Sequence, residues 1–174
     1  MDGMSRRRRF IFSFVLALSI VFPGLLFAGQ YKVSRITDGD TIQVIADGTK
    51  TIIRLVGIDA PEVSHAKNQP GQPFGQQSTK HLAGLVLNKI VDIKSYGLDR
   101  YGRTLGEVFL DGKSINLEMV KAGLAEVYRG TPAKGQNMEP YRKAEEEAKA
   151  AKRGMWVLGA KYVSPKEWRK GYQN

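Results

Sequence analysis

The alternation of apolar and polar residues predicts that β-strands dominate the chain from residue 31 to residue 58. Residues 31–36 and 41–46 alternate with a period of two, as in strands that bury one face. Residues 49–58 are too apolar for a strand with one solvated face, so we expect a central strand there. Asp47-Gly48 lies between the last two of these segments and predicts a β-hairpin.

A helix interrupts the strands, and two more helices follow them. Leu82, Leu85 and Val86 recur at helical spacing and predict a helix over residues 76–88. The prolines and glycines of residues 61–75 predict a surface loop before it. Further strands are expected at residues 90–96 and 105–110. Further helices are expected at residues 115–122, after a Ser114 cap, and at residues 139–152, ended by Gly154 and followed by a buried Trp156.

Five strands with one helix between the third and the fourth are the element order of an OB-fold. The sequence therefore predicts an α+β domain: a five-stranded OB-fold barrel with that interposed helix and two helices after the barrel. We assign this domain to residues 29–157 and interpret residues 158–174 as a basic C-terminal tail.

Residues 1–28 have the pattern of a secretory leader. Four arginines at positions 6–9 precede an apolar run that ends at Ala28, which predicts a signal peptide cleaved near Ala28. We then expect a secreted or periplasmic protein. The run also approaches membrane-spanning length, and Leu26 is a poor residue for a cleavage site. The alternative is therefore an uncleaved membrane anchor that holds the domain outside the cytoplasm.

The basic character of the chain belongs to its domain. The formal net charge is +10, and residues 29–174 keep +7 of it, because residues 1–28 contain four arginines and one aspartate. A basic domain favours polyanions or anionic membrane surfaces as partners. The sequence contains no cysteine, which excludes disulfides and thiolate metal sites. His65 and Lys67 lie in the predicted loop and His81 on the predicted helix, and none of the three is given a role.

Carboxylates gather where adjacent predicted strands end. Asp40 opens one strand and Asp59 ends the next, and two carboxylates with a carbonyl and waters suit a hard cation such as Ca2+. Arg54 lies in the apolar strand between them, where a charge is costly unless it is paired. It can clamp a phosphate, form a buried ion pair with an aspartate, or do both. Glu62 is either a general base or a solvated glutamate.

Three short segments give the chain a family resemblance. They are Asp38-Gly39-Asp40-Thr41, Arg54 followed by Asp59-Ala60-Pro61-Glu62, and Asp99-Arg100-Tyr101-Gly102-Arg103. Their order and spacing resemble the thermonuclease (staphylococcal nuclease-like) family, and the likeness covers roughly residues 31–156. Ala60 departs from the best-known member, which has threonine there.

The resemblance implies a role for each matching residue. The metal ligands would be Asp40, Asp59 and the Thr41 carbonyl, and the metal would be Ca2+. The catalytic residues would be Arg54, Glu62 and Arg103. The substrate-binding residues would be Arg100, Tyr101 and, at a less similar spacing, Tyr128.

Together these expectations predict an exported metal-dependent nuclease that hydrolyses DNA and RNA. The family resemblance implies that the metal is Ca2+ and that cleavage leaves 3′-phosphates. The sequence implies no protein partner, and we expect a monomer. One alternative is a non-catalytic OB-fold module that binds single-stranded nucleic acid, which would need basic and aromatic residues but no acidic cluster. A membrane-anchored basic adaptor is another, and it leaves the acidic cluster unexplained.

Overall fold

The computed structural model describes residues 29–64 and 70–171. The expectations for the leader, His65 and Lys67 therefore lie outside the described residues. No helix within the described part of the chain is long and apolar enough to cross a membrane.

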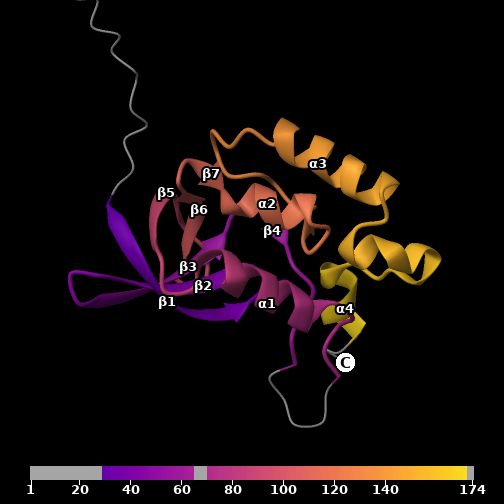
Figure 1. Cartoon of the computed structure of the whole chain (residues 1–174), viewed down its shortest axis with the longest axis horizontal. Helices are drawn as coiled ribbons and strands as arrows, with labels where there is room; N and C mark the ends of the chain where they lie inside the picture. The colour runs from indigo at the N-terminus through magenta and orange to yellow at the C-terminus, as the bar shows by residue number, and fades with distance from the viewer. Residues whose placement is uncertain (1–28, 65–69, 172–174) are drawn as a thin grey trace, which may run out of the picture.

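Five strands close into a barrel, as predicted (Figure 1). Their hydrogen-bonded order is β3-β2-β1-β5-β6, with antiparallel neighbours, and a parallel pairing of β3 with β6 closes the circle. The strands are β1 (Gln30–Asp38), β2 (Thr41–Ala46), β3 (Thr49–Leu55), β5 (Ile90–Leu98) and β6 (Thr104–Leu110), and the short β7 (Lys113–Ser114) pairs with β6.

The barrel closes around the apolar residues that the period-two pattern marks. Ile42 and Val44 of β2 are fully buried, and Ile53 of β3 is nearly so. Asp47 and Gly48 both have positive φ, as the predicted two-residue hairpin requires. The β3 strand has neighbours on both sides and is central, as expected, although its Ile52 is exposed.

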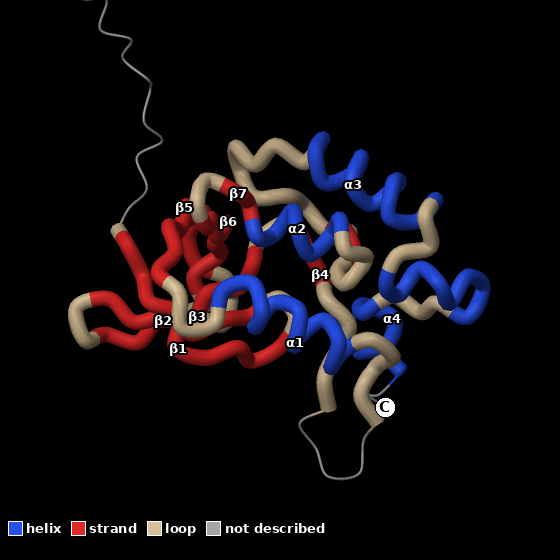
Figure 2. The backbone as a smooth tube through the Cα atoms, viewed as in Figure 1, coloured by secondary structure: helices blue, strands red, loops and turns tan. Residues whose placement is uncertain are grey.

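Helices cover one side of the barrel (Figure 2). The interposed α1 (Gly75–Val86) packs against β1. After the barrel, α2 (Ile115–Lys121) packs against α3 (Glu139–Ala150), and Ser114 caps α2 by accepting a hydrogen bond from the Leu117 amide. Trp156 is buried in a small second cluster with Ala148 and Met155, as the sequence predicts.

The strand predicted over residues 49–58 is two strands, which corrects the sequence prediction. Gly57 has φ +81°, so the chain turns after Leu55, and the residues beyond it leave the barrel. They form β4 (Ile58–Asp59), which pairs with β8 (Glu126–Val127). This turn places Asp59 opposite Glu126 and away from the end of a continuous β3.

Residues 154–171 include two further helical segments, whereas the sequence predicts a basic C-terminal tail over residues 158–174. A 3-10 helix, η1 (Gly154–Lys161), and a further helix, α4 (Pro165–Gly171), follow α3. The Tyr162 ring packs on Trp156 with 4.6 Å between centroids, and its hydroxyl donates to Glu126 Oε2 at 2.9 Å. These contacts return the chain to β8, the strand that pairs with Asp59.

Asn116 joins α2 to the point where the barrel closes. Its buried Nδ2 donates to the carbonyls of Val56 at 2.9 Å and Gly106 at 3.1 Å. Its Oδ1 accepts from the Val108 amide at 3.0 Å. One amide thereby bonds three backbone groups at the point where β3 and β6 pair in parallel.

Asn116→Ala should lower the free energy of unfolding by about 3 kcal/mol, because it leaves several buried backbone groups unpaired. Urea denaturation followed by circular dichroism measures this change. Lys121→Ala, at an exposed position of the same helix, is the control and should change stability by less than about 0.5 kcal/mol. Equal stability of the two variants would show that the Asn116 bonds do not hold the closure.

Candidate active site

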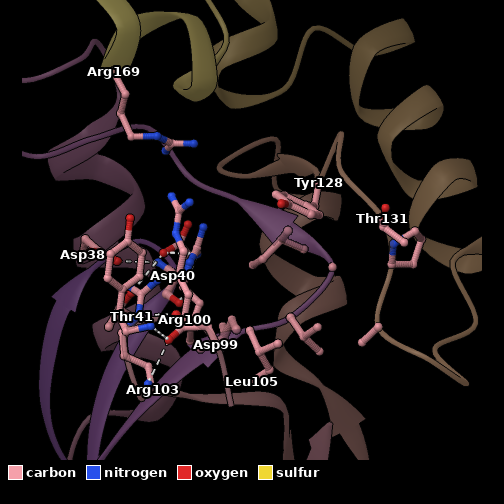
Figure 3. A pocket seen from close by; sticks show the side chains of 18 of the residues that line it. Asp38, Asp40, Thr41, Asp99, Arg100, Arg103, Leu105, Tyr128, Thr131 and Arg169 are labelled. Atoms are coloured by element: carbon pink, nitrogen blue, oxygen red, sulfur yellow. Dashed lines mark hydrogen bonds and ion pairs between the residues drawn. The ribbon is translucent and has the colours of Figure 1, made fainter. Parts of the chain in front are cut away.

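A cleft of about 750 Å³ opens at one end of the barrel (Figure 3). It gathers eight of the nine residues that the sequence analysis assigns to the site, namely Asp40, Thr41, Arg54, Glu62, Arg100, Tyr101, Arg103 and Tyr128. The ninth, Asp59, is buried behind the cleft and pairs with Arg54. The structure therefore brings the whole predicted set together.

The turn between β1 and β2 holds Asp40 in one orientation. The Asp40 amide donates to Asp38 Oδ1 at 3.0 Å, and Asp40 Oδ2 accepts from the Ala60 amide at 2.7 Å. The same turn packs closely against α1, and Gly39 makes this possible, since a Cβ there would lie 1.9 Å from Ser78 Oγ on α1. The Thr41 hydroxyl donates to Asp40 Oδ1 at 3.1 Å, while the role predicted for the Thr41 carbonyl stays a prediction.

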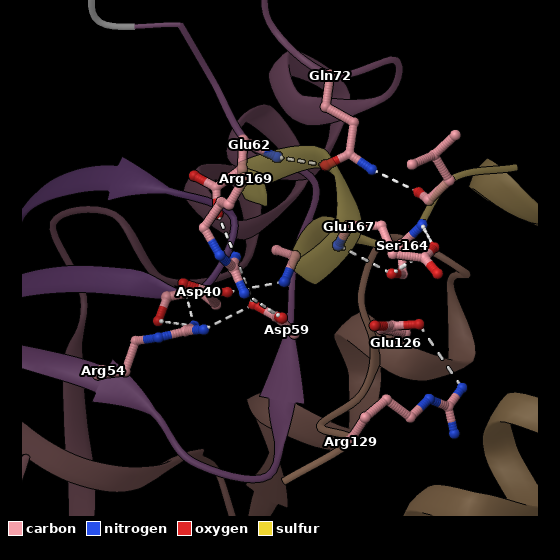
Figure 4. A network of polar contacts seen from close by, with 12 residues as sticks. Asp40, Arg54, Asp59, Glu62, Gln72, Glu126, Arg129, Ser164, Glu167 and Arg169 are labelled. Atoms are coloured by element: carbon pink, nitrogen blue, oxygen red, sulfur yellow. Dashed lines mark hydrogen bonds and ion pairs between the residues drawn. The ribbon is translucent and has the colours of Figure 1, made fainter. Parts of the chain in front are cut away.

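Arg54 bridges the two aspartates (Figure 4). Its Nη1 pairs with Asp40 Oδ1 and its Nη2 lies 2.9 Å from Asp59 Oδ1, which confirms the buried ion pair that the sequence suggests. Burial lowers the pKa of Arg54, and the charge of Asp59 opposes that shift. A guanidinium remains charged even so. One cation therefore spans both carboxylates.

The backbone pairing of β4 with β8 positions Asp59. It lies opposite Glu126, which is also fully buried. Burial raises the pKa of Glu126, while hydrogen bonding from Tyr162 opposes the rise. The Arg129 guanidinium lies 3.6 Å from Glu126 Oε2 and offsets the repulsion between the two carboxylates.

The loop between β5 and β6 presents Arg103 and Tyr101 to the cleft. Asp99 organises this loop by accepting from the Tyr101 amide at 2.8 Å, the Arg103 amide at 2.9 Å and Arg103 Nε at 2.7 Å. Burial would raise the pKa of Asp99, but these hydrogen bonds outweigh it and lower the pKa. The Tyr101 ring is 68% exposed and has the guanidinium groups of Arg100 and Arg103 at 4.8 and 5.5 Å from its centroid.

Tyr128 lies on the opposite side of the cleft, near Thr131 (Figure 3). Its amide donates to the Gly57 carbonyl at 3.0 Å, so the turn after β3 also positions this ring. The next residue, Arg129, turns to the Glu145 carboxylate at 2.7 Å. The cleft therefore has aromatic rings on two sides.

Arg169 of α4 is the site residue that sequence reasoning missed. It pairs with Asp59 through Nη2 at 2.7 Å and with Glu62 through Nη1. Burial works against its charge, but the hydrogen bonds to Asp59 and Glu62 raise the pKa of Arg169. A signal for α4 was present in the sequence: Ser164-Pro165-Lys166-Glu167 is a capping box with proline at the first helical position. The Ser164 hydroxyl and the Glu167 carboxylate bond each other's backbone amides, at 3.2 and 3.3 Å.

The donor atoms suit a hard cation. Asp40 and Asp59 both contact one guanidinium, and carboxylate oxygens are the ligands that such an ion prefers. Among the described residues no three acidic or histidine side chains cluster closely enough to hold a metal by themselves. A cation here would therefore complete its shell with backbone oxygens and water.

Comparison with known proteins decides the family. The family model described as "Staphylococcal nuclease homologue" matches residues 52–157. The chain belongs to the staphylococcal nuclease homologue family. Membership makes it a nuclease, a hydrolase of phosphodiester bonds, and confirms the resemblance drawn from the sequence.

Similar proteins occur in bacteria and yeasts. An "Uncharacterized endonuclease" of Haemophilus influenzae is 37% identical over 96% of this chain and 88% of its own length. An "Uncharacterized endonuclease" of Escherichia coli O157:H7 is 40% identical over 79% of this chain and 83% of its own. A "Probable endonuclease LCL3" of Clavispora lusitaniae is 35% identical over 85% of this chain but 64% of its own length.

The Asp99 bonds predict a pH-dependent contribution to stability. Because the folded pKa of Asp99 lies below its unfolded value, the contribution is present above the unfolded pKa, about 4, and is lost as pH falls through the folded pKa. Wild type should thus be more stable than Asp99→Asn at neutral pH, and the difference should shrink below about pH 4. Urea denaturation of both proteins across this range tests it, and a constant difference would contradict it.

Proposed function

We propose that this nuclease is an endonuclease that cleaves DNA and RNA with the help of Ca2+ and leaves 3′-phosphates. The observation that carries the proposal is the Arg54 bridge between Asp40 and Asp59 in a cleft that also contains Glu62 and Arg103. The endonuclease names of the bacterial relatives agree with it.

The cleft walls suit a single nucleic-acid strand. Arg100 and Arg103 flank the exposed Tyr101 ring, which supplies a flat surface for a base beside positive charge. Stacking on tyrosine does not discriminate strongly among bases. Tyr128 offers a second ring from the far side of the cleft. This arrangement favours a substrate range that includes DNA and RNA.

Asp40 and Asp59 would hold the metal, with backbone oxygen and water as further ligands. When bound, Ca2+ would supply positive charge beside the phosphate and polarise its oxygens. Arg54 and Arg103 would hydrogen-bond the non-bridging oxygens, which gain negative charge as phosphorus becomes five-coordinate. A planar guanidinium can contact two such oxygens at once.

Glu62 would act as the general base. It would take a proton from a water molecule as the water oxygen forms a bond to phosphorus. The bond from phosphorus to the 5′-oxygen then breaks, and this oxygen leaves with its negative charge stabilised by Arg103 and takes a proton from solvent. The 3′-oxygen stays on phosphorus, which gives the 3′-phosphate.

Export is the second part of the proposal and rests on the sequence of residues 1–28 alone. Protein recovered outside the cytoplasm of its native host should begin near Gly29 or Gln30. Intact mass measurement decides this, whereas full-length protein in the membrane fraction would establish the anchor.

Single-turnover cleavage of single-stranded DNA and RNA tests the enzymatic proposal. Wild type should cut with Ca2+ and stop in excess chelator, and Glu62→Gln should cut about 10²–10⁴-fold more slowly because the base is lost. Binding of the substrate, measured by filter retention, should stay level or tighten, because a negative charge has left a cleft that faces a polyanion.

Glu147→Gln, at an exposed position of α3 away from the cleft, is the charge-matched control and should cut at the wild-type rate. Undiminished cleavage in excess chelator would show that the reaction needs no metal. Cleavage by Glu62→Gln at the wild-type rate would show that Glu62 is not the general base. A wild type that binds without cutting would establish the non-catalytic OB-fold module instead.

A further inference from the structure

The C-terminal helix α4 is fastened beside the acidic end of the cleft. Gln72 Nε2 donates to the Val163 carbonyl at 2.7 Å, and Gln72 Oε1 accepts from the Glu62 amide at 3.1 Å. The Tyr162 bond to Glu126 anchors the same segment on β8. Figure 4 shows Arg169 reaching from this helix to the acids that Arg54 approaches from the barrel.

Arg169 uses oxygen atoms that a metal ion would need. Its Nη1 and Nη2 donate to Asp59 Oδ1 at 3.1 Å and Oδ2 at 2.7 Å, while Nη1 also bonds Glu62 Oε1. Asp59 Oδ1 accepts from Arg54 as well. A carboxylate has about four acceptor positions, and three on Asp59 are filled. A cation at Asp59 must therefore compete with a guanidinium.

The charged groups around Asp59 also disfavour a bound cation while Arg169 is in place. The carboxylates of Asp40, Asp59 and Glu62 face the guanidinium groups of Arg54 and Arg169. A divalent cation bound at Asp59 would share one carboxylate with both guanidinium groups, and these like charges would repel one another. Withdrawal of one arginine removes that conflict.

Arg169 is the arginine that can withdraw. Arg54 lies in a barrel strand with 15% of its side chain exposed. Moving its guanidinium away would break the ion pairs with both Asp40 and Asp59. Arg169 has 37% of its side chain exposed and belongs to a seven-residue helix whose only buried residue is Pro165. Because α4 contributes so little to the buried core, its local detachment should cost less free energy than global unfolding.

We propose that Arg169 is a tethered competitor of the metal, so that α4 controls the loading of Asp59 with a divalent cation. The inference rests on the proposed Ca2+ site and adds its regulation. With Arg169 in place, Asp59 and Glu62 are neutralised by the chain's own cation; with α4 withdrawn, both carboxylates face the cleft. The arrangement makes the metal-free enzyme a closed state.

Titration calorimetry with Ca2+ alone, without nucleic acid, tests the competition. Arg169→Gln should bind Ca2+ at least about tenfold more tightly than wild type, because a competing charge has gone. Lys170→Gln is the matched control: it removes the same charge from the next, exposed residue of α4 and should leave the affinity within about twofold of wild type. Equal or weaker binding by Arg169→Gln would overturn the proposal.

Hydrogen exchange of the wild type gives a readout that needs no substitution. Saturating Ca2+ should speed the exchange of backbone amides in residues 165–171 relative to the chelated protein, and unchanged or slower exchange there would contradict the competition. The proposed function is judged separately by wild-type cleavage with Ca2+. If the wild type cuts and binds Ca2+ and Arg169→Gln binds it with equal affinity, only the proposed role of Arg169 is contradicted. If neither protein binds Ca2+, both the proposed Ca2+ site and its regulation by Arg169 are contradicted.

Discussion

A buried arginine between two aspartates is the interaction on which the site depends. Neither carboxylate could stay buried and charged alone, because desolvation would be too costly. Arg54 reaches both from the strand that closes the barrel, so the ion pairs and the closure support each other. The same pairing holds two acids, the oxygen donors that a hard cation prefers, together at the edge of the cleft of a nuclease.

Close backbone approaches set the positions of these charges. Gly39 lets the first turn press against α1, and Gly57 turns the chain so that Asp59 leaves the barrel and pairs with β8. Asn116 ties the two closing strands to α2. The barrel and its turns form one side of the cleft. Helix α4, in which only Pro165 is buried, lies on the other side.

Local patterns in the sequence predict the barrel well, since Ile42, Val44 and the Asp47-Gly48 turn each express a local rule of strands and hairpins. They also predict that Asp40 and Asp59 lie close together, although the structure achieves this through the Arg54 bridge and the β4–β8 pair and not through the end of a continuous β3. The break at Gly57 was missed because an apolar run does not reveal where pairing changes partner. Arg169 was missed because its partners lie more than a hundred residues away, although its capping box was visible.

A double-mutant cycle between Arg54 and Asp59 tests most directly whether these residues form one unit. Single-turnover DNA cleavage with Ca2+ would be measured for wild type, Arg54→Ala, Asp59→Ala and the double variant. The structure predicts that the double variant is hardly slower than the worse single variant, because either change dismantles the same site. Rate losses that multiply would contradict it and would assign the two residues independent roles.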